Sequence, residues 1–237
     1  PLLCNIYPNG DADVNHFHAA GGTGYLFRAL LTQGLMHADA QVVWGADFSD
    51  YTQEPCERDG ALRWQQAPTA SLDDQVLRAG NKPFSAEGGL KLLTGNLGRS
   101  VIKTSAVALD RRLITGPAVV IEHQDELDAL FAAGDLNQDC VVVVRGQGPK
   151  ANGMPELHKL TPFLGALQDQ GYRVALVTDG RMSGASGKVP AAIHLTPEAL
   201  DGGLIGRIQN GDVICLDSDA GELTVLVDPD QMSERPD

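Results

Sequence analysis

Short apolar runs recur along the last two thirds of the chain and predict β-strands. Each run is four to six residues long, is rich in Val, Ile, Leu or Ala, and lies near Gly, Asp or Asn residues that favour turns. The predicted strands are residues 90–94, 101–104, 118–122, 140–144, 173–178, 191–195, 213–217 and 223–227. Asp219, Ala220 and Gly221 separate the last two runs, so we expect a hairpin there.

Apolar positions with helical spacing occupy residues 23–36, 124–133 and 156–170, and Thr23 is a plausible N-cap of the first of these helices. Many strands with few helices predict a mixed α+β fold, in which a β-barrel or sandwich is flanked by helices.

Residues 45–88 contain few apolar runs and many Pro, Asp, Gln and Glu residues, which predicts a long irregular connection. We expect a domain boundary near residues 72–85. A helical and irregular segment, 1–75, then precedes a β-barrel-like domain, 76–237.

Composition limits the classes of function. A net charge of −13 with a pI near 4.7 argues against nucleic-acid binding, which needs a clustered basic surface. Neither an apolar run of the roughly 20 residues that span a bilayer nor a signal peptide is present in the sequence, so a cytoplasmic protein without membrane contact is expected. The four cysteines are scattered and form no Cys-x-x-Cys pair, so no zinc or local iron–sulfur motif is indicated.

The segment 175–188 is the strongest candidate for a functional loop. An apolar strand ends there in a run of small, polar and charged residues, namely Asp179, Gly180, Arg181, Ser183, Gly184, Ser186, Gly187 and Lys188. Glycines allow backbone N–H groups to approach an anionic ligand closely, and the cations beside them favour phosphate or carboxylate. An ordinary solvated turn has the same composition, so both interpretations remain open.

The segment VTDGRMSGAS within this loop resembles the C-terminal motif of the dihydroxy-acid and 6-phosphogluconate dehydratase family. Segments with the same resemblance extend over nearly the whole chain, at residues 11–22, 95–103, 145–156 and 187–199. The two histidines after Asn15 and the run SGASGKVPAAIH are most similar to the phosphogluconate branch. The branched-chain branch usually has Thr where this chain has Ala185.

The resemblance implies that the chain is the C-terminal part of a longer enzyme. Its fold would be a small β-barrel flanked by helices, similar to the swivelling domain of aconitase-like proteins, and its partner would be the N-terminal domain of the same protein. The full-length protein would form a homodimer, and the fragment alone would be inactive.

The same resemblance implies a hydro-lyase of the Entner–Doudoroff pathway that dehydrates a phosphorylated sugar acid. Ser183 would act as an alkoxide base, and Glu156 would bind Mg²⁺ or Mn²⁺. An iron–sulfur cluster, of the 4Fe-4S type and with ligands outside this chain, would be the Lewis acid. A Glu in a first helical turn is also favoured by the helix dipole alone. A branched-chain or unphosphorylated substrate, or a non-catalytic sugar-phosphate-binding domain, remains open.

Several side chains are candidates for substrate binding within the segments that carry the resemblance. They are Arg181, Lys188, Ser186, His16, His18 and Lys103. Arg28, Arg145 and Lys150 are further candidates for a local basic pocket. Each cation alone is more often a solvated surface charge, and their concentration in glycine-rich loops is what favours a site.

Overall fold

The computed structural model describes residues 1–7, 9–43, 47–182 and 187–236. Ser183 and Ser186 therefore lie outside the described residues. The chain divides into two compact units, Pro1–Gly88 and Gly89–Asp237, each with its own hydrophobic core.

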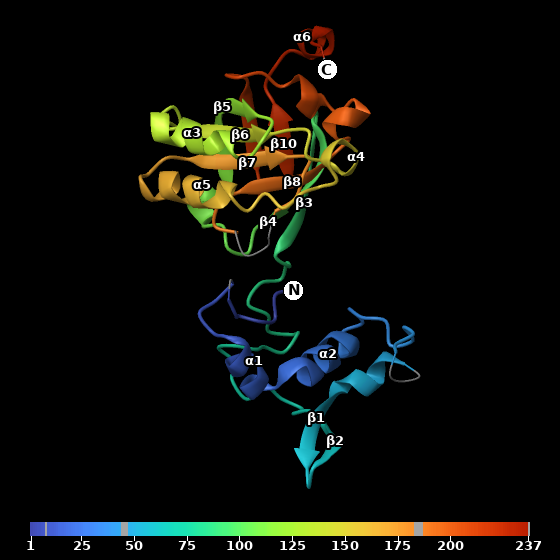
Figure 1. Cartoon of the computed structure of the whole chain (residues 1–237). Coiled ribbons are helices and arrows are strands. Elements are labelled where there is room, and N and C mark those ends of the chain that lie inside the picture. Colours follow the sequence, from blue (N-terminus) through green and yellow to red (C-terminus); the bar gives the residue numbers. More distant parts are fainter. Residues whose placement is uncertain (8, 44–46, 183–186, 237) are drawn as a thin grey trace. The chain divides into compact units, whose positions relative to one another are not determined.

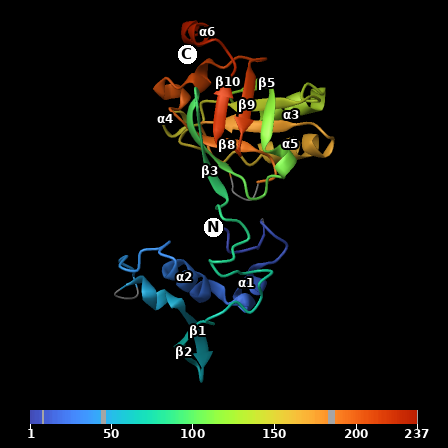
Figure 2. The same ribbon diagram turned by 180° about the vertical axis from the view of Figure 1, so that it is seen from behind.

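In the described part of the second unit, eight strands close into a barrel (Figures 1 and 2). The strands are β3 Leu90–Gly95, β4 Gly98–Lys103, β5 Leu113–Ile121, β6 Cys140–Val144, β7 Val174–Thr178, β8 Ala191–Thr196, β9 Val213–Asp217 and β10 Glu222–Val225. Their order around the barrel is β10-β3-β4-β8-β7-β6-β5-β9. The predicted small barrel flanked by helices is thereby confirmed, as is the hairpin between β9 and β10.

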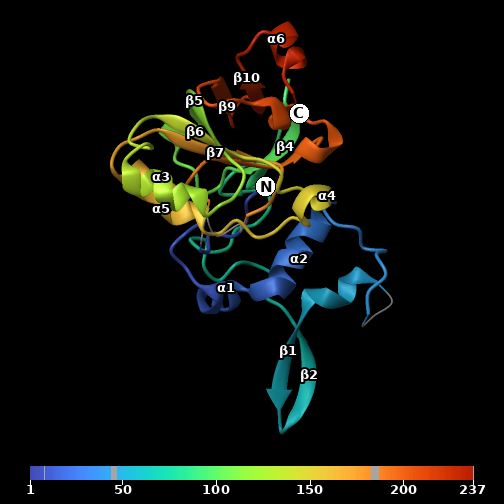
Figure 3. The same cartoon turned by 45° about the horizontal axis from the view of Figure 1, so that its top comes forward.

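Strands β5, β6, β7 and β8 pair in parallel, and helices connect β5 to β6 and β6 to β7. Helices α3 (Glu126–Ala133) and α5 (Leu160–Asp169) lie together outside β6 and β7 (Figure 3). Val141 and Val143 of β6 pack inside the barrel, whereas Val142 and Val144 pack against these helices. Because both faces of the strand are buried, its sequence is continuously apolar instead of alternating.

The shorter helical elements cover ends and loops of the same unit. They are α4 Pro149–Asn152 and α6 Pro229–Glu234, with 3-10 turns at η2 Leu109–Arg111, η4 Ala199–Asp201 and η5 Leu204–Arg207. Among the described helices, none has the combination of length and apolar composition that crossing a membrane requires.

The first unit has more regular structure than its sequence predicts. It contains α1 (Val14–Ala20), α2 (Gly22–Thr32), the 3-10 turn η1 (Phe48–Thr52), and a hairpin of β1 (Gln53–Arg58) and β2 (Ala61–Gln66). The segment 11–22 is thus mostly helix, and the expected irregular stretch 45–88 contains a β-hairpin. The sequence did not reveal α1 or the hairpin because neither needs an apolar pattern. β2 is exposed along its whole length, and α1 buries only Ala20.

Two helices differ in their bounds from the prediction. The first predicted helix starts at Gly22 and has Gly21 (φ 137°) as its N-cap, so Thr23 is not the cap. The helix predicted for 156–170 begins only at Leu160, which leaves Glu156 outside it.

Candidate active site

Glu156 and Arg181 are brought together at the end of β7. They form an isolated parallel β-bridge, in which the Leu157 N–H donates to the Arg181 carbonyl at 3.2 Å. Arg181 Nη1 lies 2.7 Å from Glu156 Oε2, and Arg181 Nε donates to the Met154 carbonyl at 2.8 Å. The Arg181 guanidinium therefore holds both the carboxylate and the chain segment that carries it.

This arrangement corrects the interpretation of Glu156 as a residue of a first helical turn. Glu156 is extended, and its side chain is 30% exposed. Met154, just before it, adopts a left-handed backbone with φ 59°, which is uncommon for a non-glycine residue. The Glu156 carboxylate is thus positioned by the backbone conformation at Met154 and by the ion pair with Arg181. It is not in the first turn of a helix, so a helix dipole does not explain its position.

Asp179 organises the loops at this end of the barrel, where its sequence allowed either a role in orienting the loop or an ordinary turn residue. The residue is 1% exposed. Its carboxylate accepts hydrogen bonds from the backbone N–H groups of Gly146 (3.1 Å), Gln147 (2.9 Å) and Ala199 (3.0 Å). These donors follow β6 and β8, so one side chain joins the loops after three neighbouring parallel strands.

Glu198 has a similar role and was missed in the sequence. It is 5% exposed, and its carboxylate accepts from the backbone N–H groups of Lys150 (3.0 Å) and Ala151 (3.1 Å) at the start of α4. A Cβ at Gly148 would lie 2.1 Å from Glu198 Oε2, so this glycine is required by the close approach. The start of α4, within the glycine-rich segment 145–153, is therefore fixed by a buried carboxylate.

Lys103 ends β4 and lies beside the backbone that follows residues 183–186. A Cβ built on Gly187 would lie 3.4 Å from Lys103 Cδ and 3.2 Å from Ala106 Cβ. Burial lowers the pKa of the Lys103 ammonium. The side chain is half-buried next to the candidate loop and is not simply solvated.

Lys188 is exposed and lines a pocket formed with the segment 106–111 and with α5. Lys150 forms an ion pair with Asp201, whose hydrogen bond raises the pKa of the lysine. Among the expected cations, Lys103, Arg181 and Lys188 thus stay near the candidate loop, whereas Lys150 has a different partner.

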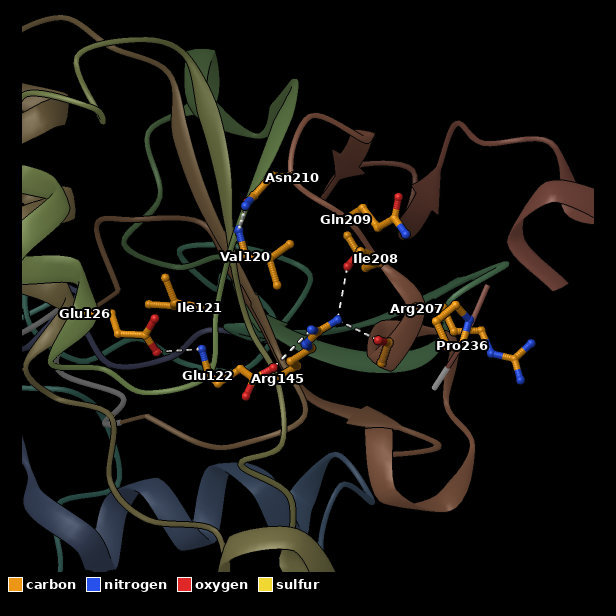
Figure 4. Close-up of a pocket in the computed structure, with 11 residues that line it drawn as sticks. Val120, Ile121, Glu122, Glu126, Arg145, Arg207, Ile208, Gln209, Asn210 and Pro236 are labelled. Atoms are coloured by element: carbon orange, nitrogen blue, oxygen red, sulfur yellow. Dashed lines mark hydrogen bonds and ion pairs between the residues drawn. The ribbon is translucent and has the colours of Figure 1, made fainter. Parts of the chain in front are cut away.

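Arg145 and Arg28 have structural roles. Arg145 Nη1 donates to the Gly206 (2.6 Å) and Ile208 (3.1 Å) carbonyls, and Nη2 donates to Glu122 Oε1 at 3.0 Å (Figure 4). In the first unit, the Arg28 guanidinium donates to the carbonyls of Thr52, Ala67 and Pro68. Both guanidinium groups therefore donate hydrogen bonds to backbone carbonyl oxygens. They do not form the expected basic pocket.

His16 and His18 lie on α1 of the first unit, and both are exposed. The His16 N–H donates to Asp13 Oδ1 at 3.0 Å and the Asp13 N–H donates to His16 Nδ1 at 3.3 Å, which together form a capping box. The hydrogen bond from the His16 backbone N–H lowers the pKa of Asp13. His16 thus shapes the start of α1 through backbone and side-chain contacts with Asp13.

Metal-binding chemistry is sparse among the described residues, where no group of three or more His, Cys, Asp or Glu side chains is suited to a metal ion. Cys140 is buried in β6, and burial together with Asp139 raises the pKa of its thiol to about 11. Cys215 lies in β9.

Comparison with known proteins identifies the family of this chain. Residues 75–237 match the family model of the dihydroxy-acid/6-phosphogluconate dehydratase C-terminal domain, and residues 1–51 match that of the N-terminal domain. Proteins named phosphogluconate dehydratase from Pseudomonas aeruginosa and Escherichia coli are 57% and 55% identical to this chain over 99% of it. A dihydroxy-acid dehydratase from Halorhodospira halophila is 34% identical over 99% of it.

The chain spans 39% of the length of the two phosphogluconate dehydratases. The match to the C-terminal family model covers most of the chain, and it includes Glu156, Asp179, Arg181 and every strand of the barrel. The chain belongs to the dihydroxy-acid/6-phosphogluconate dehydratase family.

Proposed function

We propose that this chain is the C-terminal part of a hydro-lyase that converts 6-phosphogluconate into 2-dehydro-3-deoxy-6-phosphogluconate and water, the dehydration step of the Entner–Doudoroff pathway. The main support is the 49–57% identity to proteins named phosphogluconate dehydratase, against 34% to a dihydroxy-acid dehydratase. A phosphorylated sugar acid is therefore favoured over a branched-chain dihydroxy acid.

In this proposal Ser183 removes the proton at C2, next to the substrate carboxylate. A serine hydroxyl ionises far above neutral pH, so its alkoxide needs a positive environment. Lys103, beside Gly187, brings such charge to the end of the segment that contains Ser183, whereas the charge of Arg181, two residues before Ser183, is paired with Glu156. Ser186, Lys188, His16 and His18 are the further proposed contacts to the substrate.

Two electrophilic groups complete the proposed chemistry. A divalent cation, Mg²⁺ or Mn²⁺, and an iron–sulfur cluster of the 4Fe-4S type supply the Lewis acidity for the substrate carboxylate and for the departing hydroxyl. Glu156 would provide one oxygen ligand to the cation, and Arg181 would orient that carboxylate. The described cysteines do not fit a cluster, because they are separated and Cys140 is buried in the barrel wall. Its ligands are therefore proposed to lie elsewhere in the full-length protein.

We also propose that residues 1–75 close the N-terminal catalytic domain and that residues 76–237 form the C-terminal domain. The matches of the two family models, to 1–51 and 75–237, support this division. The proposed partners are the rest of the same chain and a second subunit, in a cytoplasmic enzyme. The fragment alone is expected to be inactive, since it would lack the cluster ligands.

The base is tested by Ser183→Ala in the full-length enzyme. We expect this variant to fold normally and to have lost exchange of the substrate's C2 proton with solvent, measured by NMR in D₂O. Exchange at the wild-type rate would exclude Ser183 as the base. Comparing turnover of 6-phosphogluconate, gluconate and a branched-chain dihydroxy acid tests the substrate class.

A further inference from the structure

A pocket of about 560 Å³ opens between helix α5 and the segment that follows β4. Arg111 and Lys188 line it together with Thr161, Gly165, Gln168 and Asp169 of α5. A Cβ at Gly165 would meet no atom within 4 Å, so the helix leaves this wall open. The pocket is separate from the one around Arg145 shown in Figure 4.

Two polar atoms in the wall of this pocket lack partners among the described residues. They are Thr161 Oγ1 and Gln168 Nε2, both buried side-chain atoms. Gln168 is only 3% exposed, although its amide can donate two hydrogen bonds. Buried polar groups are almost always satisfied by protein, water or a ligand, so this pair indicates a polar occupant.

The charges of the pocket indicate the sign of that occupant. Arg111 and Lys188 contribute two positive charges and Asp169 contributes one negative charge, in a chain whose net charge is −13. Arg111 Nη2 donates to the Gln168 carbonyl at 3.2 Å, which fixes the guanidinium at the end of α5. A positive pocket with neutral donors inside a strongly acidic protein favours an anion.

We propose that this pocket binds a phosphate group. Arg111 and Lys188 balance its charge, while the Gln168 amide and the Thr161 hydroxyl donate to its oxygens. The phosphate belongs either to the sugar-acid substrate or to a separate phosphorylated metabolite. The first case rests on the proposed function, and it is favoured by Ala106, which lines the pocket and also flanks Gly187 next to the candidate loop.

The test measures binding of inorganic phosphate to the full-length protein by calorimetry, without turnover. We expect Lys188→Ala and Gln168→Leu each to weaken binding about tenfold, as loss of one hydrogen bond to a charged group does. Lys188→Arg should retain most of the affinity. Lys159→Ala is the matched control, because that lysine pairs with Asp125 and does not line the pocket.

Kinetics distinguish the two sources of phosphate. If the substrate's phosphate binds here, Gln168→Leu raises KM for 6-phosphogluconate about tenfold and leaves KM for gluconate unchanged. If a separate metabolite binds here, phosphate affinity falls while both KM values stay the same. Phosphate affinity equal to wild type in both Lys188→Ala and Gln168→Leu overturns the proposal. C2 proton exchange tests the dehydration independently, so the two failures are distinguishable.

Discussion

Arg181 Nη1 lies 2.7 Å from Glu156 Oε2, in a β-bridge that joins two segments 25 residues apart. The sequence suggested that Arg181 binds the substrate and that Glu156 binds a cation. Because the same guanidinium also donates to the Met154 carbonyl, Arg181 is committed to the loop that presents Glu156. We therefore regard Arg181 as a positioning residue for this carboxylate.

Arg181→Ala should lower kcat/KM of the full-length enzyme by roughly 10–100-fold, the usual effect of removing the group that orients a metal-binding side chain. The free energy of unfolding should change by less than about 1 kcal/mol, because the ion pair is partly exposed and its net contribution is small. Steady-state kinetics and urea denaturation measure the two quantities.

Arg181→Lys is the matched control for charge. A lysine keeps the positive charge but cannot hold Glu156 and the Met154 carbonyl with one rigid fork, so we expect an intermediate loss. Wild-type kcat/KM in both variants would contradict the positioning role.

Asp179→Ala should destabilise the protein by about 3 kcal/mol or more, because three backbone N–H groups would lose a buried acceptor. Asp179→Asn retains one oxygen and should cost less. Chemical denaturation measures both changes, with the exposed Asp135→Ala as a control expected to stay within about 0.5 kcal/mol. Asp179→Ala with wild-type stability would show that the three loops are held by other contacts.

Acid should weaken the attachment of the C-terminal helix α6. Arg235 Nη2 donates to Asp212 Oδ1 at 2.9 Å, and Nη1 contacts the other carboxylate oxygen. Burial of Asp212 raises its pKa, but the hydrogen bonds from Arg235 and from the Gln209 N–H outweigh it, so the pKa is lowered overall.

A lowered pKa means that this stabilisation is fully present above the unfolded-state pKa of about 3.9 and is lost as the pH falls through the folded value. Asp212→Asn should therefore be less stable than wild type by about 1–2 kcal/mol at pH 7. The difference should shrink below about pH 4. Thermal unfolding across this range measures it, and a gap independent of pH would exclude the ion pair as its cause.

Two glycines should respond oppositely to alanine. Gly98 has φ 117°, and its Cβ would lie 2.3 Å from the Thr196 carbonyl oxygen, so Gly98→Ala should destabilise the barrel by about 2 kcal/mol or more. Gly165 lies in α5 with open space around its Cβ, so Gly165→Ala should stabilise by about 0.5–1 kcal/mol. Denaturation midpoints compare them, and a shift in the same direction for both would contradict the argument.

The barrel strands were largely predictable, because local composition carries their signal. β6 (Cys140–Val144) and β9 (Val213–Asp217) agree with the prediction residue for residue, since β6 is buried throughout and β9 is buried at Ile214 and Leu216, where apolar side chains are required. The hairpin β1–β2 was missed because it is mostly exposed. An exposed hairpin needs no pattern of apolar residues that the sequence could reveal.

The candidate site was only partly predictable. The sequence by itself determined the family and most strands of the second unit, since these depend on contiguous motifs and on apolar runs, but the apolar runs left a barrel and a sandwich open. Only the tertiary structure decided that Arg181 holds Glu156, that Asp179 and Glu198 bind the backbone of distant loops, and that Arg145 is engaged by carbonyl groups. These hydrogen bonds and ion pairs join residues far apart in the chain. Local sequence cannot specify which charged side chain will bond to which distant backbone group.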